Sequence, residues 1–227
     1  MQRYVAVSQQ EDDCSISQKL PREELIRRSR ILFIDDETPG LITDLQKAHF
    51  AVDHVTDIDS TNIEYIDKKL YDLILLDFGG VGLHFGEDEG LSLLKYIKRV
   101  NPATIVLSYT SKALKPHHAD FYRLTDGVLQ KDAGIADSTE KIEEALRKAH
   151  SISNVWSGLL AVCDVQPGSD EDKKMQDLLV RGLNNRGKMD SLKQTVLATL
   201  TSDEARGAAL ILLEKAIELV VKSYLTS

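Results

Sequence analysis

The chain has 227 residues, a formal net charge of −8 and a sequence pI of about 5.3. This length accommodates one well-buried domain and a smaller second one, since a typical domain takes roughly 100–150 residues. The negative charge argues against nonspecific nucleic-acid binding, which needs a basic surface to neutralise phosphates.

The sequence also gives expectations about the compartment. No stretch resembles the apolar core of a signal peptide or the roughly 20 apolar residues of a membrane span. Cys14 and Cys163 match no metal-binding or disulfide spacing, which predicts free thiols in a reducing environment. We therefore expect a cytoplasmic protein without a zinc site.

Residues 1–29 are polar and charged, and we interpret them as an N-terminal extension of unknown role. The segment PREELIRRS at the end of this extension is compatible with a short helix, but it has no sustained apolar period.

From Arg30 the pattern changes to short apolar strands that alternate with helices. Asp137 with Glu140 forms a capping-box signal for the last of these helices, which should end near His150. Aliphatic strands without a polar face must be buried on both sides, so the pattern predicts a doubly wound α/β domain over residues 30–150 with a five-stranded parallel sheet. The expected strands are RILFID (30–35), FAVDHV (50–55), YDLILLD (71–77), TIVLSY (104–109) and GVLQK (127–131).

Four of the five strands end in polar residues, and ligands of such sheets bind beyond the carboxyl ends of the strands. Three carboxylates that converge there repel one another unless a cation balances them, and hard oxygen ligands suit Mg²⁺. A lysine and a hydroxyl beside them complete the parts of a phosphoryl-transfer site. These residues are Asp35, Asp36, Asp77, Ser108 and Lys131.

The segments ILFIDDE, LILLD, IVLS and VLQK resemble, in the same order, the signature strand ends of response-regulator receiver domains. The resemblance covers roughly residues 30–150 and implies a flavodoxin-like fold. It implies that Asp35 and Asp36 hold Mg²⁺ together with Asp77 and the backbone carbonyl of Gly79. In phosphorelay signalling it also implies that Asp77 is the phosphoacceptor, that Ser108 is the switch hydroxyl and that Lys131 contacts the phosphoryl group. The implied donor is a sensor histidine kinase or a phosphotransfer protein.

Several residues depart from the family pattern. Asp132 follows Lys131 where a proline is usual, Val128 replaces a frequent aromatic, and Tyr109 stands where a small residue is common. The loop 78–90 is about five residues longer than usual and rich in glycine, and its His84 is interpreted as an ordinary loop residue. Asp132, Tyr109 and the long loop favour an alternative, a pseudo-receiver that acts as a phosphorylation-independent interaction module.

A second alternative is an enzyme that uses an aspartate nucleophile on a related sheet. Such enzymes usually carry a second acid two residues after the nucleophile to protonate the leaving group, and Gly79 stands there instead. We therefore expect no enzyme beyond self-catalysed phosphoryl transfer and dephosphorylation. His117 and His118 are interpreted as solvated residues.

Residues 151–227 are predicted to form a small all-α domain of four helices, at 154–163, 170–185, 188–200 and 202–225. The segment PGSDEDKK provides a turn and an N-cap. Nine Lys and Arg residues against ten Asp and Glu residues give this part a charge of −1, which argues against a DNA-reading helix. The apolar stretch GAALILLEKAIELVV favours a core helix. A protein partner or a second copy of the chain is the alternative, because so small a bundle benefits from burying more surface.

Overall fold

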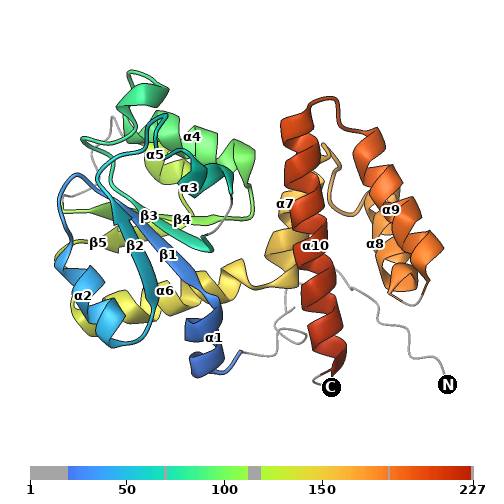
Figure 1. Ribbon diagram of the computed structural model, residues 1–227, viewed down its shortest axis with the longest axis horizontal. Helices are drawn as coiled ribbons and strands as arrows, with labels where there is room; N and C mark the ends of the chain where they lie inside the picture. The colour runs from blue at the N-terminus through green and yellow to red at the C-terminus, as the bar shows by residue number, and fades with distance from the viewer. Residues whose placement is uncertain (1–19, 69–70, 112–118, 184, 226–227) are drawn as a thin grey trace.

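A computed structural model describes residues 20–68, 71–111, 119–183 and 185–225 (Figure 1). Its sheet has five parallel strands in the order β2-β1-β3-β4-β5, which is the flavodoxin-like form of the doubly wound fold. The predicted fold class is therefore confirmed. The strands are β1 (Arg30–Ile34), β2 (Ala51–Val55), β3 (Leu73–Leu76), β4 (Ile105–Thr110) and β5 (Gly127–Gln130).

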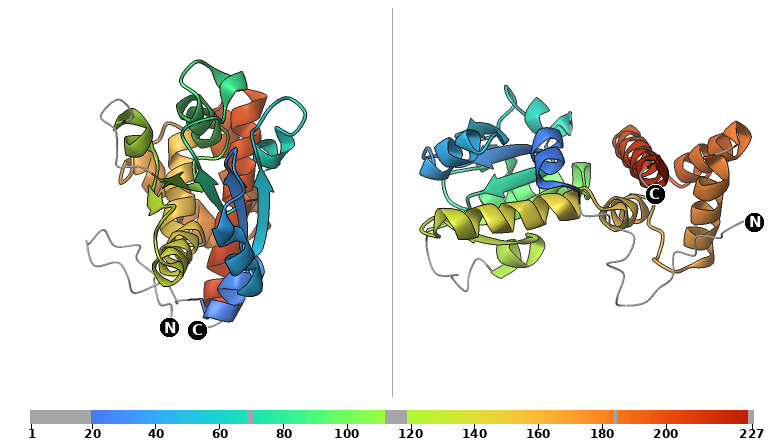
Figure 2. Two further views of the ribbon diagram at one scale, coloured as in Figure 1. Left: turned by 90° about the vertical axis from the view of Figure 1, so that its left-hand side faces the viewer. Right: turned by 90° about the horizontal axis from the view of Figure 1, so that it is seen from below.

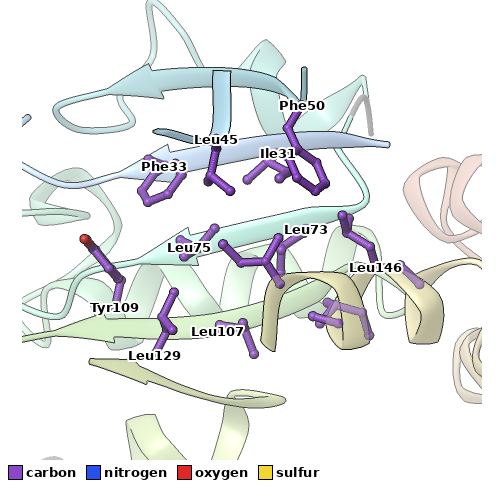
Figure 3. Close-up of a cluster of buried hydrophobic side chains, with 14 of the residues drawn as sticks. Ile31, Phe33, Leu45, Phe50, Leu73, Leu75, Leu107, Tyr109, Leu129 and Leu146 are labelled. Atoms are coloured by element: carbon purple, nitrogen blue, oxygen red, sulfur yellow. The ribbon is translucent and has the colours of Figure 1, made fainter. Parts of the chain in front are cut away.

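Helices cover both faces of the sheet, so the central strands β3 and β4 are buried along their whole length. One face packs against α1 (Arg22–Arg28), α2 (Gly40–Lys47) and α6 (Ile135–Ala149), and its side chains form the cluster in Figure 3. We call it the α6-side face. The opposite, α4-side face packs against α3 (Glu64–Asp67), α4 (Gly90–Val100) and α5 (Ala119–Leu124). A 3₁₀ helix, η1 (Leu83–Phe85), lies in the long loop between β3 and α4.

Strand register fixes which side chains share a face. Ile34 pairs with Leu76, and Leu76 pairs with Ser108, so these three lie side by side across the sheet. Ile34 and Leu76 belong to the α4-side core. Alternate residues of a strand point to opposite faces. The next residues, Asp35, Asp77 and Tyr109, are therefore expected on the α6 side.

The C-terminal part is all helical, as predicted. Its helices share a separate hydrophobic cluster, to which Ala103 of the sheet domain also contributes. The predicted N-cap is confirmed, since the Ser169 hydroxyl accepts a hydrogen bond of 3.2 Å from the backbone N–H of Asp172. The helices are α7 (Ile152–Val162), α8 (Asp170–Gly182), α9 (Arg186–Ala198) and α10 (Asp203–Leu225).

The helical part lies beside the sheet domain at the amino-terminal end of the strands (Figures 1 and 2). Asp72, directly before β3, accepts a hydrogen bond of 2.9 Å from Lys215 of α10. Asn154 of α7 donates one of 2.8 Å to the carbonyl of Ala103. The two parts are therefore in direct contact.

One expectation about the helices is wrong, and another is confirmed. The capping-box prediction at Asp137 is wrong: α6 begins at Ile135, so Asp137 lies within its first turn, where a negative charge interacts favourably with the helix dipole. The segment before β1 does form a helix, and Leu25 in it is completely buried in the α6-side core although the sequence lacks an apolar period. Leu25 and Ile26 are its buried residues, and a helix of seven residues is too short to show a sustained apolar period.

Some expectations concern residues outside the described ranges, namely Cys14, His117 and His118. Among the helices that the structure describes, none combines the length and apolar character needed to cross a bilayer.

Candidate functional site

Three carboxylates and a lysine converge at the carboxyl end of the sheet. Asp35 follows β1, Asp77 follows β3 and Lys131 follows β5. The Lys131 ammonium lies 2.7 Å from Asp35 Oδ2 and 2.8 Å from Asp77 Oδ2. Asp36 completes a group in which each carboxylate offers an oxygen within 4.8 Å of the others. The structure thus brings together four of the five strand-end residues that the sequence singles out.

Backbone groups hold the two inner carboxylates in place. Asp35 Oδ1 accepts a hydrogen bond of 3.0 Å from the N–H of Glu37, and Asp77 Oδ1 accepts one of 2.7 Å from the N–H of Phe78. The ring of His54, on β2, contacts the backbone oxygen of Asp35 at 2.9 Å. The side chain of Asp35 is 1% exposed and that of Asp77 is 19% exposed, so Asp77 is the more accessible of the pair.

The charges of this group do not balance. Lys131 supplies one positive charge against three carboxylates, and two like charges 4.8 Å apart repel by roughly 3–4 kcal/mol at an effective dielectric constant of about 20. Burial lowers the pKa of Lys131, but its hydrogen bonds to Asp35 and Asp77 outweigh burial, so the pKa lies above its usual value and the lysine stays charged. The remaining negative charge favours a divalent cation.

The donor chemistry fits Mg²⁺, which is bound through carboxylate oxygens and usually keeps several waters. The group contains only carboxylates among its candidate ligands, and exposed Asp36 leaves one side open to solvent. Gly79 lies in the loop directly after Asp77, and its carbonyl contact to a metal stays a prediction.

Ser108 shares no hydrogen bond with this group. It pairs with Leu76, one residue before Asp77, and therefore shares the α4-side face with Leu76. Its hydroxyl is buried and has no hydrogen-bond partner within the described ranges. Tyr109, the next residue, belongs to the α6-side core instead, with Lys131 Nζ 5.4 Å from the centroid of its ring. The switch role predicted for Ser108 remains untested, but the strand register favours Tyr109 as the side chain that faces the carboxylates.

The loop 78–90 is held down by acids that sequence reasoning did not assign to the site. Glu89 Oε2 accepts a hydrogen bond of 3.2 Å from the N–H of Gly80, and Asp57, beyond β2, accepts one from the N–H of Gly82. Glu89 itself is the N-cap residue of α4. Its carboxylate points back to the start of the loop, and its φ of 49° departs from helical backbone. His84 is exposed, as expected for a loop residue.

Glycines allow this loop to approach the carboxylates closely. Gly80 has a φ of 74°, and a Cβ atom there would lie 2.6 Å from Asp36 Oδ2. A Cβ atom on Gly90 would lie 2.7 Å from the carbonyl oxygen of Asp77. Any other residue at either position would displace the loop or the acids, so these glycines shape the rim of the site.

A shallow cavity of about 360 Å³ lies elsewhere, between β4, β5 and α6. Its lining includes Asp126, Lys141 and Lys148 but none of the three clustered carboxylates.

Comparisons with known proteins find a likeness only among solved structures. No protein-family model matches the chain, and no curated protein matches it. Similar solved structures are receiver domains of response regulators. The receiver domain of NtrX from Brucella abortus is 22% identical, covers 51% of this chain and 97% of its own, and has a TM-score of 0.43.

Two further structures resemble the chain to the same degree. A two-component response regulator from Clostridium difficile is 21% identical over 54% of this chain and 99% of its own, with a TM-score of 0.45. A CheY-like receiver domain protein from Methanospirillum hungatei is 22% identical over 53% and 95%, with a TM-score of 0.43. Likeness at this level concerns the fold, so the functional argument rests on the site.

Proposed function

We propose that the protein is a response regulator that accepts a phosphoryl group on Asp77. The observation that carries the proposal is the bridge from Lys131 to both Asp35 and Asp77, next to a third carboxylate. Of the two bridged acids Asp77 is the more exposed, and its Oδ1 is oriented by a backbone N–H. An accessible, fixed carboxylate beside a cation has the properties of a nucleophile for phosphoryl transfer.

In the proposed reaction, a carboxylate oxygen of Asp77 attacks the phosphorus of a phosphohistidine on a sensor kinase or phosphotransfer protein. The P–N bond breaks, the imidazole leaves with the electron pair and takes up a proton, and Asp77 becomes an acyl phosphate. Lys131 neutralises charge on the phosphoryl oxygens during transfer. Water later cleaves the acyl phosphate, which returns the carboxylate and releases inorganic phosphate.

Asp35, Asp36 and Asp77 would hold Mg²⁺ in this proposal. When bound, the ion supplies positive charge for the phosphoryl oxygens and relieves the repulsion among the carboxylates. Lys131 and the metal then have separate tasks, since Lys131 already contacts Asp35 and Asp77 without it.

The output of the proposed regulator is protein–protein contact rather than transcription. The helical part has no excess of basic residues, and α10 exposes apolar side chains such as Ile211 and Val221, each 40% exposed. Candidate partners are another protein or a second copy of the chain.

Intact mass spectrometry after incubation with Mg²⁺ and acetyl phosphate tests the proposal. We expect one phosphate adduct in the wild type and none in Asp77→Asn. Asp72→Asn is a matched control, because it removes a carboxylate at the opposite end of the same strand and should keep the adduct. A sizing column run on both forms tests dimer formation. No adduct in the wild type at high donor concentration would contradict the proposal.

The alternative function is a pseudo-receiver that interacts without phosphorylation. Two observations favour it. Asp77 is already paired with Lys131, and the buried side chain of Tyr109, which is 4% exposed, lies against the same lysine. If this alternative holds, Asp77→Asn leaves partner binding unchanged and the wild type takes up no phosphate.

A further inference from the structure

Two neighbouring polar residues of β4 point to opposite sides of the sheet. Ser108 pairs with Leu76 of β3, and Tyr109 pairs with Leu129 of β5. Leu76 belongs to the α4-side core, whereas Leu129 and Tyr109 belong to the α6-side core. Asp77 follows Leu76 and Tyr109 follows Ser108, so Tyr109 is the β4 residue beside the proposed phosphoacceptor.

The ring of Tyr109 is firmly held. It packs edge-to-face on Phe33, with ring centroids 5.4 Å apart and planes 88° apart. Figure 3 shows Tyr109 among the side chains of the α6-side cluster, with Phe33 and Leu129 also drawn. Its exposed fraction is only 4%. An aromatic ring packed in this way has little freedom to change rotamer, so it forms a fixed wall of the site.

The same ring contacts the lysine that bridges the acids. Lys131 Nζ lies 5.4 Å from the ring centroid, within the range of a cation–π interaction. The ammonium also contacts Asp35 and Asp77. Three neighbours therefore fix one flexible lysine side chain, and the ring is the only uncharged one of the three.

We propose that Tyr109, rather than Ser108, is the positioning residue of β4 for phosphoryl transfer, because its ring holds Lys131 in place between Asp35 and Asp77. This inference rests on the proposed function and deepens it. The ring acts through the lysine, since a lysine with four rotatable bonds otherwise samples many positions away from the acceptor. The proposed role needs only the ring of Tyr109. It does not require the Tyr109 hydroxyl to donate a hydrogen bond to the phosphoryl group.

Three variants test this inference. Tyr109→Phe keeps the ring, Tyr109→Leu keeps an apolar side chain without a ring, and Ser108→Ala removes the neighbouring hydroxyl on the opposite face as a matched control. The first readout is the NMR shift of the Lys131 ε-methylene protons in unphosphorylated protein. The ring current of Tyr109 should displace this shift in the wild type, Tyr109→Phe and Ser108→Ala, and Tyr109→Leu should lose the displacement.

The second readout is the rate of adduct formation with acetyl phosphate, measured over a range of donor concentrations. We expect the maximal rate to fall about tenfold in Tyr109→Leu and to stay within about twofold of wild type in Tyr109→Phe and Ser108→Ala. The half-saturating donor concentration should change less than the maximal rate, because positioning acts on the transfer step. A fall in Ser108→Ala with no change in Tyr109→Phe and Tyr109→Leu would overturn the inference.

The two readouts separate this inference from the proposed function. If the wild type forms no adduct, the proposed function fails, and the NMR shift still decides whether the ring lies against Lys131. If adducts form and the shift is the same in all variants, the inference about Tyr109 fails alone. If Tyr109→Leu does not fold, Tyr109→Phe and Ser108→Ala still test the inference, because a loss of the phosphorylation rate in either variant contradicts the role of the Tyr109 ring.

Discussion

The two ends of the sheet both carry partly buried carboxylates, but their surroundings differ. At the carboxyl end, Lys131 is shared by Asp35 and Asp77, and Asp36 adds a third carboxylate. At the amino end, Asp72 accepts hydrogen bonds from Lys215 and from a backbone N–H, and Asp126, before β5, accepts hydrogen bonds from two lysines and a backbone N–H. Negative charge is therefore in excess at the first end and neutralised at the second. In the proposed function, the same residue types serve phosphoryl transfer at one end, whereas Asp72 attaches the helical part at the other.

Two groups besides Lys215 lie close to Asp72. The backbone N–H of Arg30 donates to Asp72 Oδ2 at 3.1 Å, and the ring of His150 lies 3.9 Å from the same oxygen. His150 also contacts the Ser29 hydroxyl at 3.0 Å. Asp72 thus joins α10, β1 and the end of α6, which gives this end a structural role.

Replacing Lys131 should have the largest effect. Lys131→Met removes the positive charge from the carboxyl end, and we expect the rate of phosphate uptake from acetyl phosphate to fall about 100-fold. Lys141→Met is the control. Lys141 is an exposed lysine of α6, and within the described ranges its ammonium donates a hydrogen bond to the carbonyl of Val128. Equal rates in the two variants would show that Lys131 has no role in transfer.

Magnesium should stabilise only through the carboxyl end. At a free concentration of 100 times Kd, the ion should raise the free energy of unfolding by about 2.7 kcal/mol. We expect Asp36→Asn to lose this gain and Asp72→Asn to keep it, as measured by thermal unfolding with and without MgCl₂. If Asp72→Asn loses the gain as well, the two ends do not have separate roles.

Breaking the amino end should cost stability but not activity. Asp72→Ala leaves Lys215 without its carboxylate and should lower the free energy of unfolding by about 2 kcal/mol in urea titrations. Lys215→Met should cost less, about 1 kcal/mol, because the Arg30 N–H still donates to Asp72. The initial rate of phosphorylation should be the same in both variants as in the wild type. A tenfold loss of rate would mean that the helical part acts on the acceptor site.

A smaller effect is expected from the rim of the site. Gly90→Ala places a methyl group against the carbonyl oxygens of Asp77 and Phe78, 2.7 and 2.9 Å from its Cβ, and should cost about 1–2 kcal/mol. Gly207→Ala is the matched control, because nothing lies within 4 Å of a Cβ there and α10 should gain about 0.5–1 kcal/mol. Urea midpoints of the two variants should therefore move in opposite directions.

The sequence contains enough information to predict the sheet and the group at its carboxyl end. The strands are short aliphatic runs with clear ends, and parallel strands bring those ends together whatever the exact helix boundaries. Asp35, Asp77 and Lys131 could therefore be placed side by side without coordinates. The clustering follows from topology, whereas the chemical roles stay predictions.

Other features depend on details that the sequence does not contain. Ser108 and Tyr109 are neighbours, and a shift of one residue in register exchanges the faces to which they point. Glu89 lies nine residues after Gly80, and the hydrogen bond between them depends on the path of an irregular loop. Lys215 lies 143 residues after Asp72, and their contact depends on how two separately formed cores pack together. Local patterns carry no signal for such contacts.

The most direct test of the central claim is to locate the phosphoryl group. Borohydride reduces an acyl phosphate to an alcohol and so converts a phosphorylated aspartate to homoserine, which tandem mass spectrometry assigns to a position. After incubation with Mg²⁺ and acetyl phosphate, the account predicts homoserine at residue 77 and at neither residue 35 nor residue 36. Homoserine at another position, or none in protein that binds Mg²⁺, would contradict it.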